Sequence, residues 1–236
     1  PRCSCIGTKM KINFEEGQYL QDEGKIKVRY IHLRDASLIK NGNSLVGTVY
    51  LCIRDPTDFE DFHIRNIRAY CLQVSNSTID ISDHVKNFRV IRYTSTTLPD
   101  IELIKKLSTK LVGYTCPETH PSEYFAELTY CHRLNIGIDN GDFQEFLETL
   151  KNGPLNMLKL GIYVITSRRI SSILESFPKL DSLSLYAEHI YGVPADLGKL
   201  EVLTLHTSEP VPVDHILQAN TLKYIGGNIS YDKEVK

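Results

Sequence analysis

The sequence lacks several features that would each point to a particular class of protein. No apolar run approaches the length of a membrane-spanning helix, and the formal net charge of the 236 residues is only −2. The chain therefore carries no global electrostatic signature for nucleic acid or for a membrane surface, and any charged surface has to be local. We expect no membrane partner.

Motifs of catalytic centres are also missing. The sequence contains no G-x-x-x-x-G-K-[ST] phosphate loop, no H-E-x-x-H, no G-x-S-x-G and no G-x-G-x-x-G. We therefore expect a protein that is not an enzyme and that has no cofactor and no small-molecule substrate. The hydrophobic content of 42% and the charged content of 24% are those of an ordinary globular chain.

Cysteine is present, but its positions do not suggest a disulfide framework or a zinc site. Four of the six cysteines lie in or beside apolar, strand-like stretches: Cys52, Cys71, Cys116 and Cys131. A reduced cysteine in such a place behaves as a small hydrophobic residue. Cys3 and Cys5 form a lone C-x-C with no second close pair, so we assign no metal site. Because no apolar leader is seen either, we expect an intracellular protein of the cytoplasm or nucleus.

An apolar pattern of the form LxxLxL recurs along the chain with a nearly constant period. It is clearest in LDSLSL at 180–185, and it returns in LEVLTL, LNMLKL and CHRLNI. The middle apolar residue of each unit gives seven anchors: Phe88, Leu111, Leu134, Leu158, Leu183, Leu203 and Leu222. Their spacings run from 19 to 25 residues. Ile67 extends the series, and Ile31 and Leu51 lie 20 apart in two similar segments, although the 16-residue step from Leu51 to Ile67 breaks the period.

The gaps between these predicted strands carry helical patterns. In segment 142–154, four apolar residues fall on one helical face: Phe143, Phe146, Leu147 and Leu150. Asn140 or Asp142 is suited to cap this helix, and Gly153–Pro154 to end it. Segments 167–178 and 98–109 repeat the pattern, the latter with Pro99 in its first turn. The gaps at 191–199 and 210–220 have room for a helical turn or two.

These units resemble the leucine-rich repeat superfamily, whose repeats are 20–29 residues long. The resemblance covers residues 64–226 and implies an α/β solenoid with a curved parallel inner sheet and with helices and short helical turns on its convex side. We expect an N-terminal β cap at 1–27, the repeat array at 28–226, clear from about residue 64, and a C-terminal tail at 227–236. The Asn or Cys that usually follows each strand in this family is replaced here by Asp139, Tyr163, Glu188 and Ser208.

The resemblance also predicts which side chains are available to a partner, since residues between the leucines point out from the concave face of the sheet. These positions are basic in the N-terminal half and neutral to acidic toward the C-terminus. The candidate partner-binding residues are Arg65, Arg68, Lys86, Arg89, Arg92, His132, Arg133 and Tyr186. Because arginine can bind carboxylates and phosphates bidentately, we expect a protein partner with an acidic or phosphorylated surface.

The resemblance implies a non-enzymatic protein–protein recognition scaffold of the adaptor or substrate-receptor type, as in the substrate-recognition subunits of ubiquitin ligases. Two alternatives stay open. One is a nucleic-acid-associated factor of the RNA export or processing type, and the other is a secreted repeat protein with Cys3 and Cys5 in a disulfide cap.

One cluster of chemically reactive residue types falls outside this interpretation. The segment TCPETHPSEY brings together Cys116, Glu118, His120 and Glu123, which are residue types found in nucleophile–base pairs and metal sites. We favour a proline-punctuated loop on the convex side, with no catalytic role.

Overall fold

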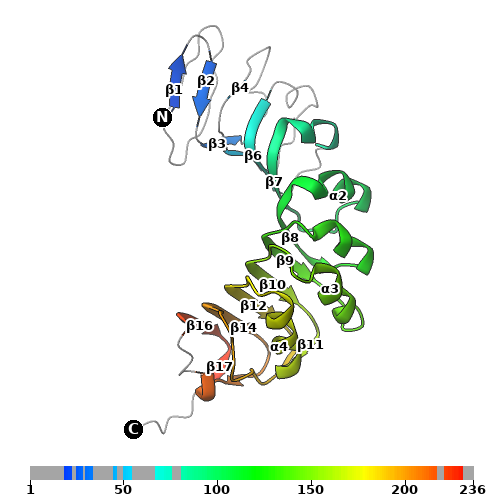
Figure 1. Ribbon diagram of the computed structural model, residues 1–236, viewed down its shortest axis with the longest axis vertical. Coiled ribbons are helices and arrows are strands. Elements are labelled where there is room, and N and C mark those ends of the chain that lie inside the picture. The colour runs from blue at the N-terminus through cyan, green and yellow to red at the C-terminus, as the bar shows by residue number, and fades with distance from the viewer. Residues whose placement is uncertain are drawn as a thin grey trace. The chain divides into compact units, whose positions relative to one another are not determined.

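The computed structural model describes residues 19–22, 25–28, 30–33, 45–46, 50–54, 67–75, 81–216 and 221–230. The fold is mixed α/β, with much parallel sheet and few helices, as Figure 1 shows. The predicted α/β class and parallel sheet are thereby confirmed. The chain divides into two compact units, Pro1–Val112 (unit 1) and Gly113–Lys236 (unit 2).

Unit 1 is built on parallel strands that follow an antiparallel pair. The pair is β1 (Tyr19–Asp22) with β2 (Lys25–Val28), which covers the described part of the expected cap; residues 1–18 lie outside the described residues. The strands that follow are β3 (Tyr30–Leu33), β4 (Leu45–Val46), β5 (Tyr50–Arg54), β6 (Ile67–Ser75) and β7 (Phe88–Thr94). Neighbouring strands within the series β3, β5, β6 and β7 are parallel, and β4 pairs in parallel with β2 and β6.

The register of unit 1 corrects two predicted anchors. Ile31 lies opposite Leu51, Leu51 opposite Leu72, and Leu72 opposite Ile91. The steps are therefore 20, 21 and 19 residues, and the irregular step predicted after Leu51 does not exist. Ile67 and Phe88 were wrong as anchors, because β7 buries its apolar residues at 88, 91 and 93, which makes Phe88 the first residue of its LxxLxL unit and Ile91 the middle one.

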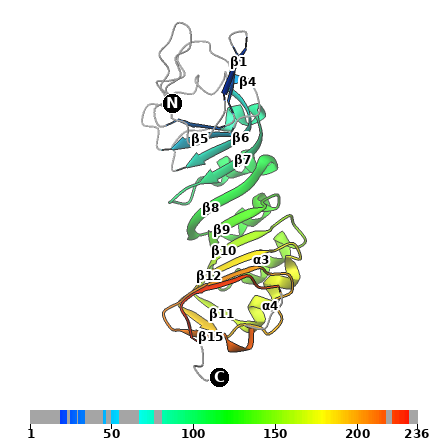
Figure 2. The ribbon, with the colours of Figure 1, turned by 90° about the vertical axis from the view of Figure 1, so that its left-hand side faces the viewer.

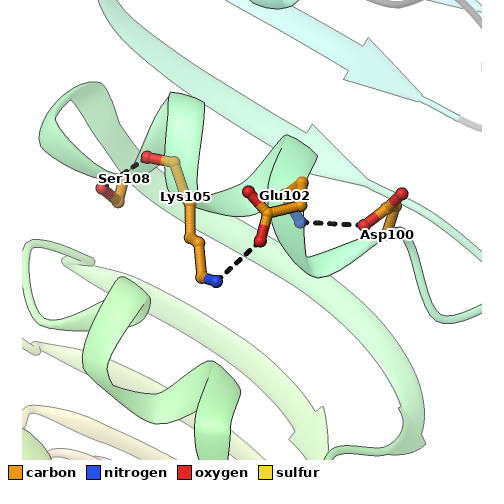
Figure 3. Close-up of polar contacts among 4 residues, drawn as sticks. All are labelled: Asp100, Glu102, Lys105 and Ser108. Carbon is orange, nitrogen blue, oxygen red and sulfur yellow. Dashed lines mark hydrogen bonds and ion pairs between the residues drawn. The ribbon is translucent and has the colours of Figure 1, made fainter.

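The helix predicted at 98–109 is α2 (Ile101–Leu107), which buries Ile104 and Leu107. It begins at Ile101, three residues after the start of the predicted segment. Asp100 is the N-cap, and its Oδ1 accepts a hydrogen bond from the backbone N–H of Glu102 at 2.8 Å, as Figure 3 shows, so Pro99 precedes the cap and is not in the first turn. At the other end, the Ser108 hydroxyl donates to the Lys105 carbonyl at 2.9 Å.

Unit 2 continues with parallel strands, each paired with the strand of the next apolar unit (Figure 2). They are β8 (Leu111–Thr119, beginning two residues before the unit boundary), β9 (Arg133–Gly137), β10 (Met157–Gly161), β12 (Ser182–Tyr186), β14 (Val202–His206) and β16 (Tyr224–Gly227). Leu134, Leu158, Leu183 and Leu203 occupy one register position, as predicted. The equivalent residues in the flanking strands are Tyr114 and Ile225, so the anchors Leu111 and Leu222 were wrong.

The gaps of unit 2 differ in what they contain. They contain η4 (Ser122–Leu128), α3 (Phe143–Leu150), α4 (Ser167–Ser176) and η5 (Asp214–Ile216), and two short parallel pairs, β11 (Val164–Thr166) with β13 (His189–Tyr191) and β15 (Val211–Pro212) with β17 (Ile229–Ser230). Helices α3 and α4 lie on one side of the strands (Figure 1). The gap at 191–199 contains a turn and no helix, contrary to expectation. Of the expected tail, Ile229–Ser230 form β17, and residues 231–236 lie outside the described residues.

The core of unit 2 lies between the strands and these gap elements. Inward-pointing leucines such as Leu158, Leu183 and Leu203 are fully buried. Behind them, the rings of Phe125, Phe146 and Phe177 pack edge to face, with centroids 5.5 and 5.9 Å apart. These rings come from η4, α3 and the C-cap of α4, so aromatic packing joins consecutive gaps to one another and to the sheet.

The loops that follow the strands are also joined, although the Asn or Cys usual in leucine-rich repeats is missing. The guanidinium of Arg169 donates to Asn140 Oδ1 at 2.8 Å and to the Val164 carbonyl at 2.7 Å. Further along, the Ser208 hydroxyl donates to the Glu188 carbonyl at 2.7 Å, and Asn228 Nδ2 donates to the Thr207 carbonyl at 3.1 Å. Side chains at other positions thus satisfy the backbone groups of these loops.

The caps of α2 and α3 provide a test of this local structure. Asp100 makes a cap hydrogen bond, whereas Asp142, at the N-cap of α3, makes none. We expect Asp100→Ala to lower the free energy of unfolding by about 1 kcal/mol, and Asp142→Ala to lower it by less than half of that. Urea denaturation of both variants measures the difference, and equal losses would contradict the capping geometry.

Candidate recognition surface

The outward strand face of unit 2 is the side of the sheet that its buried leucines do not occupy. Side chains alternate along each strand, so the residues on either side of each inward leucine point outward in three rows. The first row is Arg133, Met157, Ser182, Val202 and Tyr224; the second is Asn135, Lys159, Ser184, Thr204 and Gly226; the third is Gly137, Gly161, Tyr186 and His206. Most of these residues are half-buried or exposed, whereas the inward residues are buried.

Charge is unevenly distributed between the two units. Residues 1–112 contain 17 Lys and Arg against 13 Asp and Glu, whereas residues 113–236 contain 10 against 16. Within the outward strand face the formal charges are Arg133 and Lys159, and exposed carboxylates follow the strand ends at Asp139, Glu188 and Glu209. The formal charge of the sequence therefore changes from net positive in unit 1 to net negative in unit 2.

Unit 2 exposes several tyrosines. Among the described residues, the large apolar side chains that are exposed are Leu98, Tyr130, Tyr163, Tyr186, Tyr191 and Tyr224. Three of these rings contact histidines at the ends of strands. Tyr186 stacks on His206 with centroids 4.3 Å apart and planes 8° apart, and His189 contacts Tyr163 edge to face at 5.9 Å and Tyr191 at 5.8 Å.

The candidate residues predicted from the sequence fall into two groups. In unit 1, Arg89 and Arg92 lie on β7 and Lys86 lies just before it in η2 (Ser82–Asn87); Lys86 and Arg89 are exposed, and Arg92 lies opposite Gln73. Both arginines already take part in interactions within the protein. Arg68 lies in β6 opposite Val46, and Arg65 lies outside the described residues.

In unit 2, His132 and Arg133 are both exposed at the start of β9, whereas Tyr186 is at the end of β12. The structure therefore separates Tyr186 from the two basic residues along the strand direction. The aromatic residues Tyr163, His189 and Tyr191 were not predicted. Tyr163 precedes β11, and His189 and Tyr191 are the first and last residues of β13. These three-residue strands carry no periodic signal long enough to be detected in sequence.

The Cys–Glu–His cluster of residues 116–123 is a structural feature of the core. Cys116 is buried in β8 and His120 follows it, fully buried, so the expected convex loop is largely the end of a strand. Nε2 of His120 lies 2.8 Å from the Tyr114 hydroxyl, and Nδ1 lies 2.7 Å from the Glu118 carbonyl oxygen. The neutral tautomer with hydrogen on Nδ1 satisfies both bonds.

This geometry disfavours a nucleophile–base pair at Cys116. Both ring nitrogens of His120 are occupied by groups other than the thiol, and Glu118 and Glu123 are exposed. Burial raises the pKa of the Cys116 thiol and lowers the pKa of His120, so each is held in its neutral form at pH 7. Burial likewise raises the pKa of Cys131 to about 12. Cys71, Cys116 and Cys131 are free, buried thiols.

Comparison of the chain with protein-family models, with curated proteins and with solved structures finds no match. Within the described residues, no helix is both long and apolar enough to cross a membrane. The same residues contain no group of three or more His, Cys, Asp or Glu side chains placed to hold a metal ion.

The buried His120 predicts a specific pH dependence of stability. Burial lowers the pKa of His120 in the folded state, so the unfolded chain binds its proton more readily. The stabilisation by neutral His120 is complete above the ordinary pKa of about 6.5 and is lost as the pH falls below that value. We expect His120→Gln to cost about 1–3 kcal/mol at pH 7.5 and clearly less at pH 5.

Urea unfolding of wild type and variant at both pH values measures this difference. His132→Gln is the matched control, because His132 is exposed, and its cost at pH 7.5 should be small. A cost of His120→Gln that is the same at pH 5 and pH 7.5 would show that His120 is not held neutral by the fold.

Proposed function

We propose that the protein is a leucine-rich repeat solenoid that acts as a non-enzymatic recognition scaffold and binds a partner protein on the outward face of its parallel sheet. The observation that supports this most directly is the register. Leu134, Leu158, Leu183 and Leu203 repeat at one position of successive parallel strands, with a gap element returning the chain after each strand. Repeats of this kind present one extended face whose side chains are not needed for the core.

The partner that fits the basic residues of each unit has an acidic or phosphorylated surface. Lys86, Arg89 and Arg92 gather on and beside β7, and His132 and Arg133 begin β9. Arginine binds carboxylates and phosphates with two parallel hydrogen bonds, so it suits such a partner better than lysine does. We propose that the protein is an intracellular adaptor or substrate receptor.

Reversing the charge of one outward arginine in each unit should remove the partner. We expect the double variant Arg92→Glu/Arg133→Glu to lose the proteins that wild type captures from an intracellular extract, with a loss of at least tenfold. The matched control is Lys151→Glu/Arg168→Glu, which makes the same change of charge beside α3 and in α4, away from the strands. Quantitative mass spectrometry of the captured proteins is the measurement.

Thermal unfolding must accompany this test, because Arg92 also interacts within the protein. If both double variants fold and capture the same proteins as wild type, the outward face is not the recognition surface. If the capture is instead dominated by nucleic acid, the affinity for an RNA oligonucleotide should fall linearly with salt on a log–log plot. That result would replace the protein scaffold by the nucleic-acid-associated alternative.

A further inference from the structure

The third outward row of unit 2 contains a glycine that the fold does not require. Gly161 ends β10, and its φ is not in the left-handed region. A Cβ built on Gly161 would meet only the Cα of Gly137 at 3.5 Å and the carbonyl oxygen of Ile136 at 3.8 Å, both ordinary contacts. Gly137, by contrast, has no room, since its Cβ would lie 2.8 Å from the Pro117 carbonyl oxygen. Glycine in a strand without such a cause often marks the close approach of a ligand.

The ring of Tyr186 lies beside this bare position. Tyr186 is opposite Gly161 on one side and opposite His206 on the other, because β12 lies between β10 and β14. His206 stacks against the ring at 4.3 Å and fixes its orientation. On the Gly161 side no Cβ stands next to the tyrosine, whose side chain is 42% exposed. An aromatic ring held in this way offers a face to a planar or cationic group.

Two carboxylates lie just past this position. The loops after the strands keep the register of the sheet, since the N–H groups of Ile138 and Ile162 donate to the carbonyls of Gly161 and Tyr186, both at 2.9 Å. Asp139 and Glu188 therefore follow the strands on either side of β10 and are exposed. Neither carboxylate has a hydrogen-bond or ion-pair partner among the described residues.

Two positive charges lie near the site. Lys159 lies two residues before Gly161 on the same face and is half-buried. The guanidinium of Arg169 is already bonded to Asn140 and to the Val164 carbonyl. Asp139 and Glu188 are more exposed than either cation, and unit 2 as a whole has more acidic than basic residues. The exposed charge therefore favours a cation, and Lys159 opposes it.

We propose that this shelf, formed by Gly161, Tyr186, Asp139 and Glu188, binds an arginine side chain presented by a partner protein. The planar guanidinium lies against the open side of the Tyr186 ring and donates hydrogen bonds to one of the two carboxylates. The inference rests on the proposed function in that it takes the outward strand face as a recognition surface. The proposed ligand is positively charged, whereas the partner that fits Arg92 and Arg133 is acidic or phosphorylated.

A nucleic-acid base is the other planar group that a stacked tyrosine–histidine pair can accept. The exposed charges favour arginine over a base, because a phosphate backbone would lie beside the exposed carboxylates of Asp139 and Glu188. The two ligands also respond in opposite directions to the loss of Lys159. Lys159→Gln should strengthen binding of an arginine side chain and weaken binding of a phosphate chain.

The test is an NMR titration of the full chain with a pentapeptide, acetyl-Gly-Ser-Arg-Ser-Gly-amide, and with the same peptide carrying citrulline in place of arginine. Citrulline keeps the shape and removes the charge. We expect the arginine peptide to shift the amide signal of Gly161 and the ring signals of Tyr186, and to bind about tenfold more tightly than the citrulline peptide. Tyr130, which is exposed before β9, is the internal control and should not shift.

A side chain at position 161 tests ligand binding without disturbing the fold. Gly161→Val places a β-branched side chain beside Tyr186 in a strand that accepts it, so the melting temperature should stay the same or rise while arginine binding falls at least tenfold. Gly141→Val is the matched control, because the Cβ position of Gly141 has open space around it in a turn. It should leave binding unchanged.

The inference is overturned if the arginine and citrulline peptides bind equally, if neither shifts Gly161 or Tyr186 at millimolar concentration, or if Gly161→Val binds as wild type does. It is also overturned if an oligothymidylate shifts these signals and Lys159→Gln weakens that binding. If the peptide does not bind but wild type still captures proteins in a charge-dependent way, only the arginine site is rejected. If the peptide binds but no charge-dependent capture is seen, the proposed scaffold function is rejected and the arginine site stands.

Discussion

The inward leucines of neighbouring parallel strands lie directly opposite one another, and the chemistry of both faces of the sheet follows from that alignment. Because side chains alternate along a strand, a slip of one residue would exchange every buried leucine with an outward residue such as Lys159 or Arg133. Burial of the leucine row makes that slip very costly. The recognition chemistry of the outward face is thus fixed by residues that are themselves inaccessible to a partner.

Variation in repeat length is absorbed on the opposite side of the sheet. The steps from Leu134 to Leu158 and from Leu158 to Leu183 are 24 and 25 residues, and their gaps contain α3 and α4. The step from Leu183 to Leu203 is 20 residues, and its gap contains a turn and the short strand β13. In the two longer repeats a helix is added behind the sheet without moving the strand, whereas the 20-residue step from Tyr114 to Leu134 also accommodates a helix, η4. The rings of Phe125, Phe146 and Phe177 fill the space between these three gap elements.

The sequence predicts the fold well where the apolar residues of a strand fit a single register, and poorly where they fit two. Between Leu134 and Leu203 the polar residues between leucines leave a single register, and the prediction was confirmed. In β7 and β8, Phe88 and Leu111 head units whose middle residues, Ile91 and Tyr114, are apolar as well, so the pattern fitted two registers and the wrong one was chosen. Only the pairing with neighbouring strands distinguishes them. The same limit applies to the surface, since Tyr163, His189 and Tyr191 come together through β11 and β13, which depend on tertiary contacts.

Gly137 and Gly161 show how a structure separates residues that a sequence makes equivalent. Both follow the last inward residue of an LxxLxL unit, and both stand in the third outward row. The carbonyls of Pro117 and Glu118, which lie where β8 departs from regular pairing, leave no room for a side chain at Gly137. No such contact explains Gly161. Glycine weakens a strand, and no contact in the fold requires it at this position. A residue that costs stability and satisfies no constraint of the fold is best explained by a constraint from outside it, which is why we propose the ligand site of unit 2 beside Tyr186.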